Sequence, residues 1–331
     1  MRLMTSSGWM GAFAAFMLWL APPALAQAPK QAPLPPAKPQ ESAPPPSDST
    51  ADLPYGAYQR GYFSTAFALA TRAVEETGDV KAMTLLGILY TDGLGVPKDD
   101  AKAAQWFSLA AGRGDREAMF GLGNMRMQGR GGPADRSEAA KLYASAAKLG
   151  HAGAAYNLGL LYLDGQLFPQ DFARAAQLFR IAADAGNADA QYALATFYKE
   201  GRGVTKDLSE AARLLAAASL ADHLEAQVEY AIALFNGSGT QKNEQAAIAL
   251  FRKAARRGSP VAQNRLARIL AAGLGTTADP VEAVKWHLIS KKGGVTDLWL
   301  DDFVGKLTPE QREAGQKAAQ PWLDARSQDR S

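Results

Sequence analysis

Three histidines are the side chains in this sequence best suited to metal binding or acid–base catalysis: His151, His223 and His287. A metal site needs three or four ligands close together, and cysteine, another common ligand, is absent. His151 and His223 lie far apart in the chain, where neighbouring segments carry Asp or Asn, residues that cap helix N-termini. His287 stands where neighbouring segments carry aromatic residues, which predicts a packing or rim role. We therefore expect no metal and no cofactor.

Paired carboxylates and glycine loops are the other possible carriers of chemistry. The carboxylate pairs are sequence neighbours, expected at a helix end, a cap and a loop: Glu75–Glu76, Asp99–Asp100 and Asp301–Asp302. Adjacent helical residues do not face each other, so a pair of this kind is a poor acid–base set. The loop 201–203 follows a predicted helix, whose C-terminal end disfavours phosphate, and lacks Gly-Lys-Ser/Thr. With no nucleophile motif either, the sequence predicts no catalytic residues and a protein that is not an enzyme.

One aromatic column is the candidate partner-binding site. Phe120, Tyr156 and Tyr192 recur at equal spacing, on the expected first helix of three successive units. Tyr and Phe offer a large contact area at low entropic cost, which suits a protein interface. The alternative is that these rings pack against the neighbouring helix, as most periodic aromatic residues do.

The elements that must position these side chains recur every 36 residues. Three columns keep one residue type through six copies: Ala82, Ala118, Ala154, Ala190, Ala226 and Ala262; Gly93, Gly129, Gly165, Gly201, Gly237 and Gly273; Ala103, Ala139, Ala175, Ala211, Ala247 and Ala283. A fixed period of this length is typical of a solenoid, in which each unit packs on its neighbours.

The residue pattern within each unit predicts two antiparallel helices. The first should begin after a capping residue such as Asp79 and end at the glycine column in a left-handed cap. The second should begin after a column of Asp or Asn, with capping boxes completed by Glu138, Glu210 and Glu282. Bulky residues follow, and we expect them to pack against the second alanine column: Trp106, Leu142, Leu178, Leu214, Leu250 and Trp286.

The unit A-x-x-x-L-G-x-x-Y-x-x-G-x-G-V-x-x-D-x-x-x-A-x-x-W-x-x-x-A-A-x-x-G-D resembles the Sel-one-like repeat (SLR), a relative of the tetratricopeptide repeat. Residues 82–115 match it almost throughout, and six such units cover 79–294. Departures are Leu167-Phe168 for Gly-Val, Arg126 for Tyr, and Asp222 for a helix-ending Gly. The resemblance implies an all-α, right-handed α-solenoid of antiparallel helix pairs, whose first helices line the concave face.

The two ends of the chain differ from the repeats. Residues 1–26 predict a cleaved signal peptide, with Arg2, an apolar run and Ala24-Leu25-Ala26 before the cut; an uncleaved inner-membrane anchor is the alternative. Residues 27–54, rich in Pro and Ala, predict a disordered linker, and residues 55–78 predict a degenerate capping helix pair.

At the C-terminal end, residues 295–331 should form a cap and a polar tail, with a helix that starts at Thr308 and ends near Gln320, before Pro321. We expect an apolar cluster just before it: Leu298, Trp299, Phe303, Val304 and Leu307.

These features favour a periplasmic scaffold or regulator that binds another protein. Exported SLR proteins include periplasmic inhibitors of sensor kinases, so the resemblance implies a partner such as the periplasmic part of a membrane sensor or an envelope complex. The net charge of +3, with both signs interspersed, argues against nucleic acid. After signal cleavage we expect no stable membrane insertion. The alternatives are a peptidoglycan-binding module and an envelope enzyme.

Overall fold

The computed structural model describes residues 53–328, and side chains as far as Asp324. The described chain folds into sixteen helices: α2 (Leu53–Gln59), α3 (Phe63–Thr77), α4 (Val80–Asp92), α5 (Asp100–Gly112), α6 (Arg116–Gln128), α7 (Arg136–Lys148), α8 (Ala152–Asp164), α9 (Phe172–Asp184), α10 (Ala188–Glu200), α11 (Leu208–Leu220), α12 (Leu224–Asn236), α13 (Glu244–Arg256), α14 (Pro260–Ala272), α15 (Pro280–Lys292), α16 (Leu298–Gly305) and α17 (Pro309–Gln328). Leu53 and Pro54, which the sequence placed in the linker, belong to α2. The predicted signal peptide, 1–26, lies outside the described residues.

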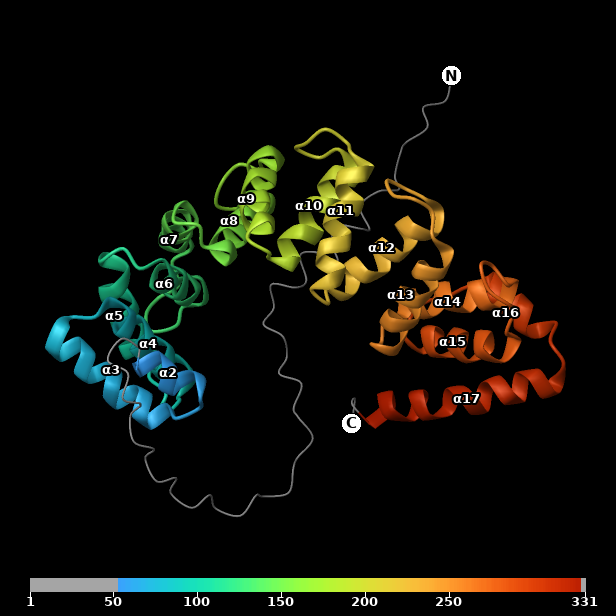
Figure 1. Cartoon of the computed structure of the whole chain (residues 1–331), viewed down its shortest axis with the longest axis horizontal. Helices are drawn as coiled ribbons and strands as arrows, with labels where there is room; N and C mark the ends of the chain where they lie inside the picture. Colours follow the sequence, from blue (N-terminus) through green and yellow to red (C-terminus); the bar gives the residue numbers. More distant parts are fainter. Residues whose placement is uncertain (1–52, 329–331) are drawn as a thin grey trace, which may run out of the picture. The chain divides into compact units, whose positions relative to one another are not determined.

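Consecutive helices pack as pairs, and each pair packs on the next. Helix α4 lies against α5, α5 against α6, and the pattern continues to α14 and α15, as can be followed along the colour gradient of Figure 1. The all-α, TPR-like solenoid with a 36-residue repeat is therefore confirmed. None of the helices within residues 53–328 combines the length and apolar character needed to cross a membrane.

The predicted caps define the helix ends. The Asp79 carboxylate accepts from the Ala82 N–H, and the equivalent residue caps the first helix of every later unit. Each first helix ends at its glycine in the left-handed conformation, as at Gly93 with φ 69°. Asp222, which replaces a glycine, keeps a positive φ of 61°, which Asp tolerates better than most residues.

The capping boxes at the second helices are only half formed. The Glu138 N–H donates to the Asp135 carboxylate, as predicted. The reciprocal bond is absent from this cap, because the Asp135 N–H already donates to the Arg126 carbonyl of the preceding helix. The Glu138 carboxylate therefore turns outward and pairs with Lys141.

The second glycine, present in five of the six loops, packs on the preceding unit. A Cβ at Gly239 would overlap the carbonyl oxygen of Leu208, at the first residue of α11. Gly239 also has a φ of 72°, which disfavours any side chain. In the third unit Leu167-Phe168 stands at the equivalent place, and the Phe168 ring stacks on Tyr162 at 4.8 Å.

The core consists of the alanine columns and of two bulky columns rather than one. The expected column is buried in part: Leu178, Leu214 and Trp286 are buried, whereas Trp106, Leu142 and Leu250 are half-buried. The column one residue later is buried in all six units: Phe107, Tyr143, Phe179, Leu215, Phe251 and His287. In the first three units the ring of this second column meets the first helix of its own unit at a glycine, as Phe179 does at Gly159.

The C-terminal end departs from the sequence prediction in two places. The predicted apolar cluster is a helix, α16, in which Leu300 is buried but Leu298 is 84% exposed. Helix α17 does not stop near Gln320; it continues through Pro321 to Gln328. Proline in a helix costs about 3 kcal/mol, and docking offsets this cost, because the Trp322 ring packs edge-on against Trp286 at 5.3 Å. Helix α17 thus lies along α15 (Figure 1).

Candidate functional site

The predicted aromatic column lies on α6, α8 and α10, half-buried at the margin of one core cluster. Phe120 stacks on the His151 ring at 4.3 Å, and Tyr192 stacks on His223 at 4.7 Å. Tyr156 packs against Phe179 at 5.5 Å. Each ring therefore has one face committed to packing and keeps only part of its surface exposed.

The two tyrosines of the column stay protonated at physiological pH. Burial raises the pKa of Tyr156 to about 12, with a further contribution from the negative charge of Asp189. Burial likewise raises the pKa of Tyr192 to about 12, helped by Glu229 and Glu225. Both hydroxyls are thus neutral groups that can donate or accept a hydrogen bond.

His151 and His223 are helix caps, as the sequence predicted. The Ala154 N–H donates to His151 Nδ1 at 3.0 Å, and the Ala226 N–H donates to His223 Nδ1 at 3.2 Å. The other ring nitrogen of His151 lies 3.0 Å from the carboxylate of Glu117, one unit earlier. The stacking of these imidazoles on the aromatic column was not predicted from the sequence. The signal was present, since Phe120 precedes His151 by the same spacing as Tyr192 precedes His223.

His287 is a packing residue, as expected, and it also ties α15 to α16. It is 1% exposed, and its Nε2 lies 2.8 Å from the Asp301 carboxylate. The Asp301 carboxylate also accepts from Lys291, and these two bonds hold the pKa of Asp301 below its usual value. Asp301 and Asp302 lie in helix α16 and not in the loop that the sequence predicted.

The carboxylates Asp99 and Asp100 and the glycine loop 201–203 have structural roles. Asp99 caps α5, and Asp100 forms an ion pair with Arg130 at 2.6 Å. Gly201 ends α10 in the left-handed conformation, as the cap interpretation of this loop predicted. Within residues 53–328, no group of three or more histidines and carboxylates is placed to hold a metal ion.

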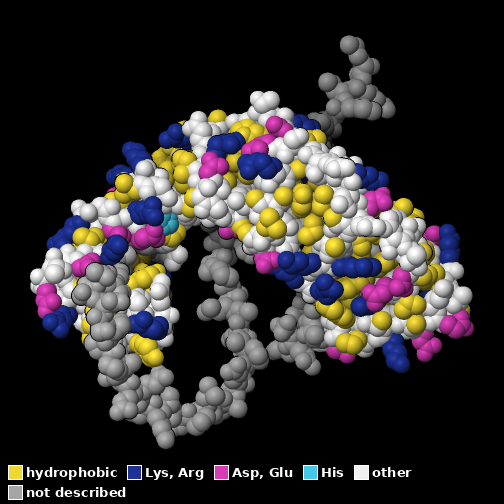
Figure 2. Space-filling view, in the orientation of Figure 1, with side chains coloured by type: hydrophobic (Ala, Val, Ile, Leu, Met, Phe, Trp, Pro, Cys, Tyr) yellow, Lys and Arg dark blue, Asp and Glu magenta, His cyan; other side chains and the backbone are white. Residues whose placement is uncertain are grey.

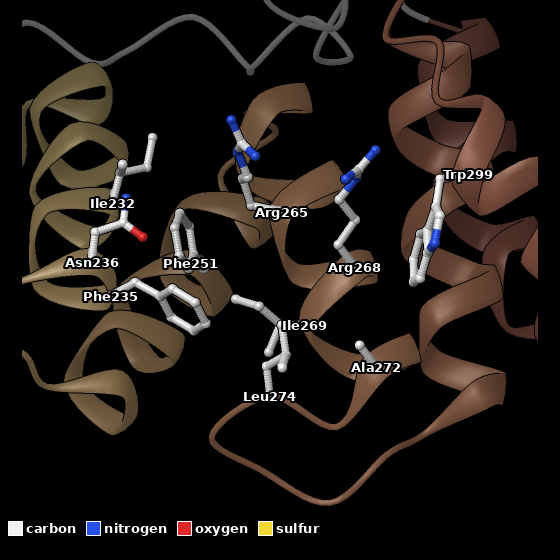
Figure 3. A pocket seen from close by; sticks show the side chains of 10 residues that line it. All are labelled: Ile232, Phe235, Asn236, Phe251, Arg265, Arg268, Ile269, Ala272, Leu274 and Trp299. Carbon is white, nitrogen blue, oxygen red and sulfur yellow. The ribbon is translucent and has the colours of Figure 1, made fainter.

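A groove between α12, α13, α14 and α16 is the feature that the sequence did not predict. It has a volume of about 310 Å³, and its lining residues are Ile232, Phe235, Asn236, Phe251, Arg265, Arg268, Ile269, Ala272, Leu274 and Trp299. Figure 3 shows the Arg265 and Arg268 side chains extending from α14 in the same direction, above Phe235 and Ile269. Trp299 and Leu274 are each about half exposed at the groove.

One wall of this groove is fixed by a buried carboxylate. Asp297 accepts two bonds from the Arg268 guanidinium, at 2.6 and 2.8 Å, and a third from Asn264. These bonds, the one from Arg268 above all, hold the pKa of Asp297 well below its usual value. The Arg268 guanidinium also lies over the Trp299 ring, 5.4 Å from its centroid. Arg268 and Trp299 thus form a single ordered wall.

The sequence profile of the Sel1 repeat matches six consecutive segments of the chain: 80–115, 116–151, 152–187, 188–223, 224–259 and 260–295. The chain belongs to the Sel1 repeat family. This family assignment agrees with the resemblance read from the alanine and glycine columns.

Two solved Sel1 repeat proteins resemble the chain in fold and in sequence. One is a Sel1 repeat protein from Oxalobacter formigenes, with 27% identity and a TM-score of 0.60, covering 74% of this chain and 97% of that one. The other is a protective antigen of uropathogenic Escherichia coli with an SLR fold, with 26% identity and a TM-score of 0.53, covering 81% of this chain and 67% of that one. A comparison with curated protein sequences gave no match. The chain therefore has the Sel1-repeat scaffold fold, which typically mediates protein interaction.

Proposed function

We propose that this Sel1 repeat protein is a non-catalytic scaffold or regulator of the periplasm that binds another protein. The six consecutive Sel1 repeats carry the proposal, because a stack of helix pairs presents an extended surface that suits a protein partner. A partner such as the periplasmic part of a membrane sensor or an envelope complex fits this role.

Export is the second part of the proposal, and the sequence supports it. Residues 1–26 combine Arg2, an apolar run too short to span a bilayer comfortably, and Ala24-Leu25-Ala26 before a cut at Gln27. Cell fractionation with N-terminal sequencing of the recovered protein tests this part. A protein that begins at Gln27 in the periplasmic fraction supports cleavage, and an intact N-terminus in the inner membrane supports the anchored alternative.

The aromatic column Phe120, Tyr156 and Tyr192 is the first contact surface that we propose. Its rings are half-buried and held in place by packing, so that little side-chain entropy is lost when a partner covers them. The neutral hydroxyls of the two tyrosines add hydrogen-bonding groups that cost less to bury than charges.

Affinity capture from envelope extract tests the scaffold role and the column together. We expect the full chain to capture a protein, and Tyr156→Ala with Tyr192→Ala to reduce the amount captured. Tyr230→Ala is the matched control, since Tyr230 is a half-buried tyrosine of α12 outside the column. Capture of no protein would refute the scaffold role. Binding to isolated peptidoglycan that is lost in the double variant, or hydrolysis of a cell-wall substrate, would favour the two alternative functions.

A further inference from the structure

The groove between α12, α13, α14 and α16 combines an apolar floor with a cation, Arg265, that is exposed to solvent. Phe235, Ile269 and Phe251 form the floor. Arg265 is exposed above it, and it forms no ion pair or hydrogen bond with any residue of the described range 53–328. Arg268 differs, since its charge is already balanced by Asp297. Arg265 is thus the group available to an anionic ligand.

The preceding unit carries a different pair of residues at these positions. Lys199 and Glu229 stand one period before Phe235 and Arg265, and they form an ion pair at 2.6 Å. At the groove, the lysine is replaced by an aromatic ring and the glutamate by an arginine. Where the preceding unit has an internal ion pair, the groove unit therefore has an apolar surface with a positive charge beside it.

The size and surroundings of the groove limit what it can bind. A volume of about 310 Å³ is at the small end of the range of roughly 300–1,000 Å³ for ligand pockets. Figure 2 shows hydrophobic and basic side chains side by side over the segment of α13 and α14. A ligand that fits must therefore offer a carboxylate next to a bulky apolar group, whereas a polyphosphate backbone would meet an apolar floor and a single unbalanced guanidinium.

We infer that this groove binds an acidic peptide segment of a partner protein, in which a carboxylate side chain lies next to a large apolar side chain. The carboxylate pairs with Arg265, and the apolar side chain lies on the floor formed by Phe235 and Ile269. This inference rests on the proposed scaffold role and gives that scaffold a second contact surface, separate from the aromatic column.

Two pools of synthetic hexapeptides test the inference. The acidic pool contains Asp, Glu, Leu and Phe, the basic pool contains Lys, Arg, Leu and Phe, and both are titrated against the full chain by fluorescence anisotropy. Arg265→Glu removes the cation. The double variant Phe235→Lys with Arg265→Glu rebuilds the Lys–Glu pair of the preceding unit, so it should fold as well as the natural chain. Lys317→Glu makes the same charge change on α17, outside the groove.

We expect the acidic pool to bind more tightly than the basic pool, and binding to weaken at least about tenfold in Arg265→Glu and in the double variant, with Lys317→Glu unchanged. Equal binding of both pools, full binding by the double variant, or equal weakening in Lys317→Glu would overturn the inference. Anionic vesicles that bind while the acidic pool does not would also overturn it.

The same variants separate this inference from the scaffold role. If the full chain captures an envelope protein and the double variant captures it equally well, the groove is not the contact surface but the scaffold role stands. If the full chain captures no protein while the acidic pool still binds through Arg265, the scaffold role fails and the recognition chemistry of the groove remains.

Discussion

The first three Sel1 repeats and the last three fill one position of the helix pair in different ways. On the first helix, this position is glycine in the first three repeats, at Gly87, Gly123 and Gly159, and alanine in the last three, at Ala195, Ala231 and Ala267. The glycines lie against buried rings, and a Cβ at Gly159 would come within 2.7 Å of Phe179. The three alanines are fully buried. One period therefore accommodates two packing solutions: a glycine against a buried ring in the first three repeats, and a buried alanine methyl group in the last three.

The largest loss of stability is expected at the second loop glycine, which packs on the preceding repeat in both the first three and the last three repeats. Gly239→Ala should destabilise the fold by more than about 3 kcal/mol, because its Cβ would overlap the Leu208 carbonyl oxygen and a positive φ adds strain. Urea unfolding followed by circular dichroism measures the change. Gly186→Ala is the control, since its φ of 86° is equally unfavourable but nothing lies within 4 Å of its Cβ; it should cost only about 1 kcal/mol. Similar losses in both variants would mean that the loop contact between units contributes little.

The next prediction tests the difference between the two halves directly. Gly159→Ala should cost about 2 kcal/mol, since overlap with the buried Phe179 ring outweighs the helix propensity that alanine gains. Ala231→Gly should also destabilise, by about 1 kcal/mol, because a buried methyl and helix propensity are both lost.

Gly112→Ala separates the propensity gain from the overlap. Gly112 ends helix α5 with nothing within 4 Å of its Cβ, so the substitution should stabilise the protein by up to about 1 kcal/mol. A stabilising Gly159→Ala would show that the ring moves aside easily, and that the two packing solutions are interchangeable.

The sequence predicts those parts of this fold that depend on one residue type at one place. Asp135 as a cap and Gly93 as a left-handed helix end follow from local chemistry, and the 36-residue period then repeats them. The role of His151 as a helix cap could also be predicted from the sequence, because His151 stands in a column that also carries Asp and Asn.

The parts that were not predicted depend on contacts between distant segments. Helix α17 passes Pro321 because Trp322 docks on Trp286, and no local pattern contains that contact. The groove needs side chains from α12, α14 and α16 together. Its only sequence signal is the change from Lys199 and Glu229 to Phe235 and Arg265, which has meaning only once these positions are known to be neighbours.

The contact between the last repeat and α16 also depends on pH, through the Asp297 carboxylate that caps α16 and pairs with Arg268. Asp297→Asn should cost about 1–2 kcal/mol at pH 7, because the half-exposed Arg268 loses its buried partner but can regain water. The pKa of Asp297 is lowered in the folded state, so its contribution is complete above the unfolded value near 3.8 and is lost as the pH falls below it. Between pH 7 and pH 3 the stability gap between natural chain and variant should therefore shrink by about 1 kcal/mol. A gap that is constant with pH would contradict the lowered pKa.

The smallest effect is expected at the ion pair that the groove lacks. Glu229→Gln breaks the pair with Lys199 on a partly exposed surface, where such pairs contribute about 0–1 kcal/mol. We expect a loss below about 0.5 kcal/mol in low salt, and none in 1 M NaCl, where charges are screened within a few ångströms. Chemical unfolding at both salt concentrations measures it. A loss of 2 kcal/mol or more, or one that persists in 1 M NaCl, would contradict the small contribution expected of an exposed ion pair.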